Sequence, residues 1–285
     1  MSERTVREAR RAAVVGAGAW GTTFACLLAE AGTPTTLWAR RDHVAAEINA
    51  GSNERYVPGR RLPEGVSATS DLVRAVEGAD LIVVAVPSQS AREVLSPLQG
   101  GLGPDVLAVS LMKGVELGTG LRMSQVLTEA LDLPAERVAV ISGPNLADEI
   151  AARQPTATVV AATDEAVAAR VAALCATSTF RPYTNTDVLG VELCGAIKNV
   201  IALAVGAAVG CGFGDNSKAT IITRGLVEIT RLGMALGASP ETFSGLAGLG
   251  DLVATCSSPL SRNQAFGRHL GQGMSVVEAS RASRG

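Results

Sequence analysis

The sequence predicts an α/β domain built on a doubly wound parallel sheet, followed by an all-helical domain. Up to about residue 185, short apolar runs rich in β-branched residues alternate with alanine-rich stretches of helical pattern. Continuous apolar strands separated by helices are typical of a parallel sheet that is covered on both faces. After Asp187 no strand-like run follows, and the remaining segments have helical patterns. We therefore expect one domain over residues 1–187 and a second over residues 188–285.

The expected elements follow from these patterns in chain order. The strands are the apolar runs Ala12–Val15, Thr35–Trp38, Leu81–Val86, Val106–Leu111, Val138–Ser142 and Thr156–Ala161. The helices that connect them are Thr22–Ala31, Asp42–Ala50, Ser70–Val76, Ala91–Leu98 and Gly120–Leu131. The helices of the second domain are Val188–Val209, Ser217–Leu236, Pro240–Leu246 and Ser261–Leu270.

The overall composition is that of a packed globular protein and excludes several classes of function. Of the 285 residues, 47% are hydrophobic and 18% are charged, which is unlike a disordered chain. The 25 Lys and Arg residues are balanced by 27 Asp and Glu residues, whereas a protein that coats nucleic acid needs a basic face. Aromatic residues make up only 3%, too few for a base-stacking surface. We expect no nucleic-acid partner.

Cysteine and histidine usage limits the chemistry further. The five cysteines are far apart and form no CxxC pair, which fits reduced thiols in a cytoplasmic protein. With only two histidines, a His-rich metal site is not available, and we expect no metal. Any acid–base chemistry must therefore use another side chain.

One uncharged segment near the N-terminus resembles a signal sequence or a short membrane span. Residues 12–29 hold no charge and follow several arginines. However, Gly16, Gly18 and Gly21 interrupt the run, which favours a strand, a turn and a helix. A second uncharged run, residues 199–214, is too short and glycine-rich for a membrane span. We expect no stable membrane insertion.

The glycine-rich turn predicts a dinucleotide site and hence a Rossmann-type domain. The segment Gly16-Ala17-Gly18-Ala19-Trp20-Gly21 follows a strand and opens a helix. The first glycine allows the tight turn, the second lets a pyrophosphate approach the backbone, and the third lets the helix pack close to the strand. Phosphate then lies at the positive end of the helix. We expect Gly16, Gly18, Ala19, Trp20 and Gly21 to bind the cofactor.

The residues after the second and third strands indicate which cofactor binds. A site for NAD would offer an acid to the ribose hydroxyls after the second strand. This chain has Arg40 and Arg41 there instead, and two guanidiniums can receive a 2′-phosphate. NADPH is therefore favoured over NADH, although solvated surface arginines would look the same. The third strand ends in Val86-Pro87-Ser88, which either lines the nicotinamide pocket or forms an ordinary turn.

Two lysines in apolar surroundings are the candidates for acid–base chemistry. Lys113 follows an apolar strand, and Lys198 lies in a helix that is almost devoid of charge. Burying an ammonium lowers its pKa, so that it can exchange a proton near neutrality. A carbonyl that is being reduced needs such a proton donor at its oxygen. The alternative is a lysine that extends to the surface, but the neighbouring Asn199 and Glu192 indicate a polar site in an apolar wall.

Two further motifs supply polar groups in the second domain. The glycine-rich run that ends at Asp251 presents an acid from a flexible turn. Asp251 can accept a substrate hydroxyl, orient the lysine, or serve only as an Asx turn or helix cap. The run Ser261-Arg262-Asn263-Gln264 has the pattern of a capping box at a helix start. Free backbone N–H groups, an arginine fork and an amide at this start would form a phosphate pocket.

Together these motifs resemble the bacterial NAD(P)-dependent glycerol-3-phosphate dehydrogenases, over nearly the whole chain. The segments that carry the resemblance are Val14–Gly21, Lys113–Glu116, Ser142–Ala147, Gly195–Asn199, Gly248–Leu252, Thr255–Ser258 and Ser261–Gln264. The resemblance implies interconversion of dihydroxyacetone phosphate and sn-glycerol 3-phosphate with NADP or NAD, for phospholipid synthesis in the cytoplasm. The sequence is compatible with a homodimer but does not define the oligomeric state.

The resemblance also implies a role for each matching residue. Lys198 would donate and accept the proton, while Lys113 would stabilise the carbonyl oxygen and contact the cofactor. The implied contacts of the substrate's reacting end are Asn199, Asp251 and Thr255, and Gly143 also touches substrate. The implied contacts of its phosphate are Ser261, Arg262 and Asn263. The implied contacts of NAD(P)H are Trp20, Arg40, Arg41, Ala147 and Arg262.

The chain departs from the family pattern at two places. Asn145 stands where many members have serine, which leaves backbone contacts available. The family normally continues for some forty residues further, and Ser280–Gly285 looks unlike the expected helices. We therefore expect a truncated or frameshifted form with exposed apolar surface and reduced activity. Two alternatives remain open, a related reductase such as one for ketopantoate, and a nucleotide-binding protein with impaired catalysis.

Overall fold

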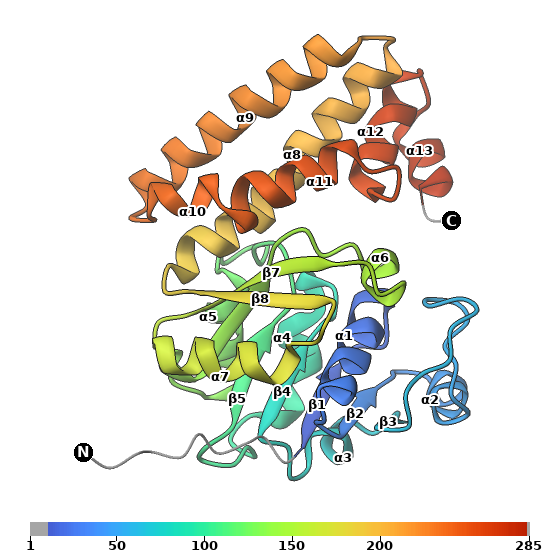
Figure 1. The fold of residues 1–285 in the computed structure, drawn as a ribbon, viewed down its shortest axis with the longest axis vertical. Helices are drawn as coiled ribbons and strands as arrows, with labels where there is room; N and C mark the ends of the chain where they lie inside the picture. Colours follow the sequence, from blue (N-terminus) through green and yellow to red (C-terminus); the bar gives the residue numbers. More distant parts are fainter. Residues whose placement is uncertain (1–10, 284–285) are drawn as a thin grey trace. The chain divides into compact units, whose positions relative to one another are not determined.

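The computed structural model describes residues 11–283, which form two compact units (Figure 1). The first unit contains the chain up to Ile141 together with Leu146–Val188. The second unit contains Leu189 onward and also Ser142–Asn145, a short segment that follows Ile141 in the sequence. Each unit is described by itself.

The first unit is built on one eight-stranded sheet with the order β3-β2-β1-β4-β5-β6-β7-β8. Its strands are β1 Ala12–Val15, β2 Thr35–Trp38, β3 Val66–Thr69, β4 Leu81–Val84, β5 Leu107–Ser110, β6 Val138–Ser142, β7 Thr156–Ala162 and β8 Phe180–Asn185. β1 pairs in parallel with β2 on one side and with β4 on the other, so the direction of chain progression reverses there. Open α/β sheets bind ligands at the carboxyl ends of strands beside such a switch point.

Helices cover both faces of this sheet and form two cores. The helices are α1 Ala19–Glu30, α2 Asp42–Asn49, α3 Leu72–Val76, α4 Ala91–Leu95, α5 Met123–Leu131, α6 Ala147–Ala151 and α7 Glu165–Cys175. One core contains Phe24 of α1 and Val171 of α7, and the other contains Leu95 of α4 and Leu127 of α5. All residues of β1 and β4 are buried, because both faces of these central strands are covered. The predicted doubly wound architecture is confirmed.

The sequence analysis missed elements at both edges of the sheet. β3 and β8 were not expected, and neither were α6 and α7. β3 has the sequence VSAT, and only Val66 in it is buried. β8 contains Pro182 and a largely exposed face, which an edge strand tolerates because one side lacks a hydrogen-bonding neighbour. Edge strands therefore lack the continuous apolar run that identified the central ones.

The second unit is entirely helical beyond Ser142–Asn145. Its helices are α8 Val188–Gly210, α9 Asp215–Ala235, α10 Pro240–Ser244, α11 Asp251–Ser257, α12 Arg262–Gly271 and α13 Val276–Ala282. A π-helical turn, Leu246–Gly250, leads directly into α11. The expected flexible turn at Asp251 is thus wrong, because this residue begins a helix. The helix α13, which was not predicted, continues to Ala282, and residues 284–285 of the segment that looked unlike the expected helices lie outside the described residues.

Four glycines bring α8 and α12 into backbone contact. A Cβ atom added to Gly206 would lie 2.0 Å from the carbonyl oxygen of Gln264, and one at Gly210 would lie 2.2 Å from that of Arg268. Gly267 and Gly271 of α12 approach the α8 backbone equally closely, within 2.0 Å and 2.2 Å of carbonyl oxygens. Only glycine permits this separation. The contact fixes the start of α12 relative to the residues that α8 carries.

α8 is the one helix in residues 11–283 that is long and apolar enough to cross a membrane. More than half of its most apolar window is buried within the structure, at 56%. It packs in the second unit against Leu252 and Cys256 of α11. α8 therefore packs as a core helix of the second unit. Large apolar side chains nevertheless remain exposed in this unit, among them Val200, Phe213, Leu236, Val276 and Val277.

Candidate active site

The glycine-rich turn between β1 and α1 has the geometry of a phosphate-binding loop. Gly16 has a φ of +120°, and a Cβ there would lie 2.7 Å from the carbonyl oxygen of Ala85. A Cβ at Gly21 would lie 1.9 Å from the oxygen of Gly16, so this glycine allows α1 to pack against the turn. By contrast, nothing lies within 4 Å of a Cβ at Gly18. The open side of the turn is therefore at Gly18, which is the N-cap of α1.

A buried asparagine that the sequence analysis missed holds this turn. Asn53 is 1% exposed, and its Nδ2 donates to the carbonyl oxygen of Ala17 at 3.3 Å and to Oγ1 of Thr22 at 2.9 Å. Both amide hydrogens are thus used to connect the turn with the first turn of α1. Asn53 lies in the loop after α2, and no motif in the sequence marks it as a neighbour of the glycines.

Five further residues expected at the cofactor lie on or beside α1, α2 and α6 of the first unit. Arg40 and Arg41 are exposed and follow β2, with Arg41 as the N-cap of α2. Ala19 and Ala147 are the first residues of α1 and α6. The indole of Trp20 packs into the core against Phe24, with ring centroids 5.5 Å apart. The Trp20 side chain therefore has a packing role in this structure.

Lys113 lies just beyond the carboxyl end of β5 and is half-buried. The loop that it begins is held by side chains from the segment after β4. Gln89 bonds to the backbone of Val115, and Arg92 forms an ion pair with Glu116. The sequence analysis did not single out Gln89 or Arg92, because their partners are distant in the sequence.

The decisive feature of the second unit is a buried lysine with two oxygen partners. Lys198 of α8 is 6% exposed and Asp251 of α11 is 2% exposed. The Nζ atom donates to Oδ1 of Asp251 and, at 2.6 Å, to Oγ1 of Thr255. Lys198 therefore does not extend to the surface. Asp251 orients the lysine, one of the uses that the sequence left open, and Asn199 lies beside the lysine and is half-buried.

The charges of this pair also act on a neighbouring thiol. Burial raises the pKa of Cys256 to about 11, with the Asp251 charge adding to the rise and the Lys198 charge opposing it. Burial disfavours a thiolate in an apolar site. Cys256 is therefore a neutral packing residue next to the lysine at physiological pH.

The start of α12 supplies the third group of polar residues. Ser261 is buried, and its Oγ accepts a hydrogen bond from the backbone N–H of Gln264 at 3.3 Å. The serine half of the expected capping box is therefore present. Arg262 is exposed and Asn263 is half-buried. The glycine contact between α8 and α12 places this helix start in the same unit as Lys198.

The segment after β6 also belongs to the second unit. Gly143 is buried with a φ of +145°, a conformation that residues with side chains rarely adopt. Both amide atoms of Asn145 are buried and have no hydrogen-bond partner within residues 11–283. Asn145 stands where the resemblance led us to expect serine. The position at which this chain departs from the family pattern therefore carries a buried side-chain amide without a hydrogen-bond partner in the described part of the chain.

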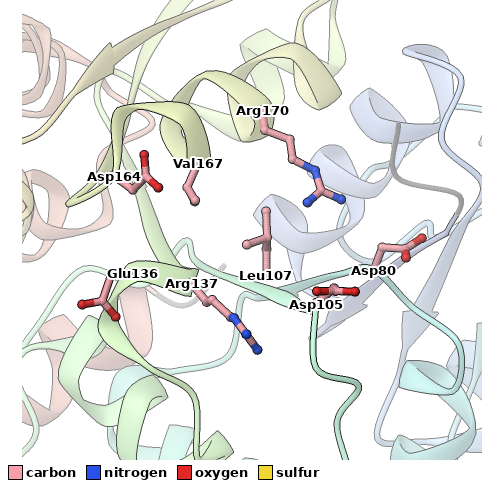
Figure 2. A pocket seen from close by; sticks show the side chains of 8 residues that line it. All are labelled: Asp80, Asp105, Leu107, Glu136, Arg137, Asp164, Val167 and Arg170. Atoms are coloured by element: carbon pink, nitrogen blue, oxygen red, sulfur yellow. The ribbon is translucent and has the colours of Figure 1, made fainter. Parts of the chain in front are cut away.

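A cavity of about 660 Å³ lies between the amino ends of β4, β5 and β6 and the helix α7 (Figure 2). Its lining residues are Asp80, Asp105, Leu107, Glu136, Arg137, Asp164, Val167 and Arg170. Asp80 and Arg137 directly precede β4 and β6, and Asp105 lies two residues before β5, whereas the glycine turn follows β1. This cavity is therefore separate from the glycine turn at the carboxyl end of β1.

Among residues 11–283, no group of three or more His, Cys, Asp or Glu side chains could hold a metal ion.

Comparison with known proteins agrees with these features. Residues 11–168 match the model of the NAD-dependent glycerol-3-phosphate dehydrogenase N-terminus. Residues 187–284 match the model of the C-terminus of the same family. The chain belongs to the NAD-dependent glycerol-3-phosphate dehydrogenase family. Its members therefore provide the reference for each of the groups above.

Individual members of the family are similar over most of the chain. Glycerol-3-phosphate dehydrogenase [NAD(P)+] of Streptomyces griseus is 60% identical over 269 residues, which are 94% of this chain and 80% of the relative. The corresponding protein of Thermobifida fusca is 58% identical, with the same two coverages of 94% and 80%. The crystal structure of glycerol-3-phosphate dehydrogenase from Coxiella burnetii has a TM-score of 0.90 at 39% identity, and covers 96% of this chain and 83% of its own.

The ketopantoate alternative is supported only by the fold. A putative 2-dehydropantoate 2-reductase from Enterococcus faecalis has a TM-score of 0.51 at 13% identity. At this identity the likeness concerns the architecture alone. The glycerol-3-phosphate dehydrogenase family is therefore the assignment that the sequence and the structure both support.

Proposed function

We propose that the protein is a cytoplasmic oxidoreductase that interconverts dihydroxyacetone phosphate and sn-glycerol 3-phosphate with NAD(P)H, and that it supplies glycerol 3-phosphate for phospholipid synthesis. The observation that carries the proposal is the buried Lys198, held by Asp251 and Thr255 in a chain that belongs to this family. A phosphorylated small molecule is its substrate partner. A homodimer is compatible with this activity.

The first unit is the proposed cofactor-binding domain. The open space at Gly18 and the start of α1 fit a pyrophosphate, because free N–H groups and the helix dipole favour an anion there. The proposed contacts are Gly16, Gly18, Ala19, Trp20, Gly21, Arg40, Arg41, Lys113, Ala147 and Arg262. Arg40 and Arg41 favour NADPH, since their guanidiniums can bind the 2′-phosphate.

The second unit supplies the proposed acid–base chemistry. A nicotinamide cofactor held by the glycine turn of the first unit would supply or accept the hydride. Lys198 gives a proton from Nζ to the carbonyl oxygen during reduction and takes it back during oxidation. Asp251 and Thr255 hold Nζ in a fixed direction, so that little reorganisation is needed when the proton moves. Lys113 is the second proposed positive charge for stabilising the carbonyl oxygen.

The remaining polar residues hold the substrate. Asn199 and Thr255, together with the backbone of Gly143, would contact its reacting end. Ser261, Arg262 and Asn263 would bind its phosphate at the start of α12, where an arginine and free N–H groups come together. A carboxylate substrate such as ketopantoate would not need this phosphate-binding set.

A direct assay tests the proposal. Purified protein is mixed with NADPH or NADH and with dihydroxyacetone phosphate or ketopantoate, and loss of the reduced nicotinamide is followed. We expect turnover with dihydroxyacetone phosphate and faster turnover with NADPH. Binding of NADPH without turnover of either ketone would reject the enzyme and favour a nucleotide-binding protein. Turnover of ketopantoate alone would assign the related reductase.

A further inference from the structure

The loops after β4 and β5 stay in register beyond the end of the sheet. Within the sheet, Leu81 pairs with Leu107, an offset of 26 residues. Beyond the sheet, Gln89 bonds to the backbone of Val115 with the same offset of 26 residues. The parallel pairing of the two strands therefore aligns two irregular segments, of which the second begins with Lys113.

The first contact between these segments is steric. A Cβ added to Gly114 would lie 2.9 Å from Oγ of Ser88 and 3.3 Å from its Cβ. A larger residue at position 114 would therefore require either the Ser88 side chain or the backbone next to Lys113 to shift.

The second contact uses both ends of one amide. Nε2 of Gln89 donates to the carbonyl oxygen of Val115 at 2.8 Å, and Oε1 accepts from the backbone N–H of Leu117 at 2.9 Å. A single side chain thus holds the backbone on both sides of Glu116. Neither bond could be replaced by an apolar side chain of the same size.

The third contact is a bidentate ion pair. Nε and Nη2 of Arg92 donate to the two carboxylate oxygens of Glu116 at 2.9 and 3.0 Å, and Nη2 also donates to Glu129 at 2.8 Å. Thr119 donates to the same carboxylate at 2.7 Å. The bonds from Arg92 hold the pKa of Glu116 below its ordinary value. Bidentate arginine–carboxylate pairs fix orientation as well as distance.

Stability alone gives a weak reason for this arrangement. The side chains of Arg92, Glu129 and Glu116 are 38%, 53% and 13% exposed, and ion pairs with such an exposed arginine contribute little to the free energy of folding. What the three contacts share is the segment that they hold, Lys113–Leu117. Their effect is therefore on the position of that segment.

We infer that Gln89 and Arg92 are positioning residues, which hold Lys113–Leu117 and through it keep Lys113 where the reaction needs it. The inference rests on the proposed function, in which Lys113 acts at the carbonyl oxygen. Neither residue touches substrate or cofactor in this account. Catalysis is sensitive to such positioning, because a displacement of about 1 Å can lower the rate by about 100-fold.

Two variants and two matched controls test the inference in the full chain. Gln89→Ala removes the two amide–backbone bonds, and Glu116→Gln removes the ion pair. Asn49→Ala is the control for the first, because Asn49 also brackets a backbone residue, Ala68, at 2.9 and 2.7 Å. Glu30→Gln is the control for the second, because Glu30 also binds one arginine at 2.9 Å.

We expect the two variants to lower kcat for dihydroxyacetone phosphate by about 10- to 100-fold, as for a displaced catalytic group. The Kd for NADPH and the melting temperature should change no more than in the controls. Arg92→Lys, which keeps the charge but loses the fork, should fall between wild type and Arg92→Ala. Wild-type kcat in both Gln89→Ala and Glu116→Gln would overturn the inference.

A second measurement does not depend on activity. Trypsin cleaves after Lys113, so limited digestion of the ligand-free protein reports how firmly the segment is held. We expect faster cleavage at Lys113 in Gln89→Ala and Glu116→Gln than in wild type or the controls. If the wild type does not turn over the ketone, the proposed function fails. The digestion result still shows whether Gln89 and Glu116 restrain the segment Lys113–Leu117. Unchanged cleavage, or faster cleavage with wild-type kcat, would overturn the inference.

Discussion

The Nζ atom of Lys198 and the Oγ1 atom of Thr255 lie 2.6 Å apart in the interior of the second unit, and Asp251 binds the same nitrogen. The three residues come from two helices, α8 and α11. A buried ammonium is tolerated only when it is paired and hydrogen-bonded, and here both conditions are met. The arrangement has direct consequences for variants at each position.

Removing the lysine should abolish proton transfer without affecting cofactor binding. We expect Lys198→Ala to lower kcat by about 100-fold or more, since general acid–base groups contribute at least this much. Lys198→Arg keeps the positive charge beside Asp251 but cannot give up a proton, so its kcat should also stay low while its fold is retained. NADPH affinity, measured by fluorescence titration, should be nearly unchanged in both. Near-normal turnover in either variant would remove Lys198 from the mechanism.

Removing the counter-ion should cost stability as well as rate. Asp251→Asn leaves the buried charge of Lys198 without its partner, and we expect a loss of about 3 kcal/mol or more in the free energy of unfolding. Thr255→Val keeps the ion pair and loses one hydrogen bond, so its loss should be near 1 kcal/mol, or about 1.5 kcal/mol at most for this bond type. Urea unfolding measures both. Equal losses in the two variants would contradict the ion-pair account.

The arginines after β2 should discriminate between the two cofactors. We expect the double variant Arg40→Ala/Arg41→Ala to weaken NADPH by about 10- to 100-fold, from the loss of charge-assisted bonds to the 2′-phosphate. NADH lacks this phosphate, so its Kd should change little. The comparison requires both Kd values in the same buffer, because such contacts are screened by salt. Equal losses for the two cofactors would refute the 2′-phosphate role.

The same substitution at two glycines of the turn should affect different properties, cofactor binding at Gly18 and fold stability at Gly21. Gly18→Ala meets no atom within 4 Å, so it should cost at most about 1 kcal/mol of stability, the value of a helix cap, yet weaken NADPH binding. Gly21→Ala forces a Cβ to 1.9 Å from the oxygen of Gly16 and should destabilise the fold by about 3 kcal/mol. Melting temperatures and NADPH titrations separate the two. Unchanged NADPH affinity in Gly18→Ala would place the pyrophosphate elsewhere.

The cysteines should differ in reactivity according to burial. Burial raises the pKa of Cys26 and of Cys175 to about 12, and that of Cys256 to about 11. Cys194 is buried and Cys211 is exposed. A thiol reagent at pH 8 should therefore label Cys211 rapidly in the folded protein and all five thiols after denaturation. Rapid labelling of Cys256 in the folded state would contradict its burial.

The same thiols imply a pH dependence of stability. A folded-state pKa above the ordinary value of 9.0 means that the fold keeps a proton which the unfolded chain releases. The contribution of these protonated thiols to the free energy of unfolding is therefore fully present below about pH 9. It is lost as the pH rises toward the folded-state pKa values. Replacing Cys175 with Ala should flatten this loss in urea titrations between pH 8 and pH 10.

The central strands were predictable from the sequence and the edge strands were not. β1 and β2 have the predicted bounds, because almost all of their residues are buried and both are short runs of small, β-branched or large apolar residues. β8 includes Arg181 and Pro182 with several exposed residues. Its position follows from pairing with β7, which is a long-range contact that local patterns do not encode.

The site was predictable in its residues and less so in its connections. The burial of Lys198 follows from an uncharged helix, but its link to Asp251 was only one of several uses that the sequence allowed. The glycines before Asp251 suggested flexibility, whereas the structure requires at least one of them for close packing. A Cβ at Gly248 would lie 2.1 Å from the oxygen of Phe243. Such contacts depend on tertiary approach, and a glycine looks the same in either case.

The backbone contact between α8 and α12 has a consequence for how the protein can change. The main chains of α8 and α12 are in contact at Gly206, Gly210, Gly267 and Gly271. The span between Lys198 of α8 and Ser261 at the start of α12 is therefore fixed by the backbone and does not depend on side-chain size. Surface residues around it are free to vary in charge without altering that span. A single methyl group at one of the four glycines would force the two helix backbones apart.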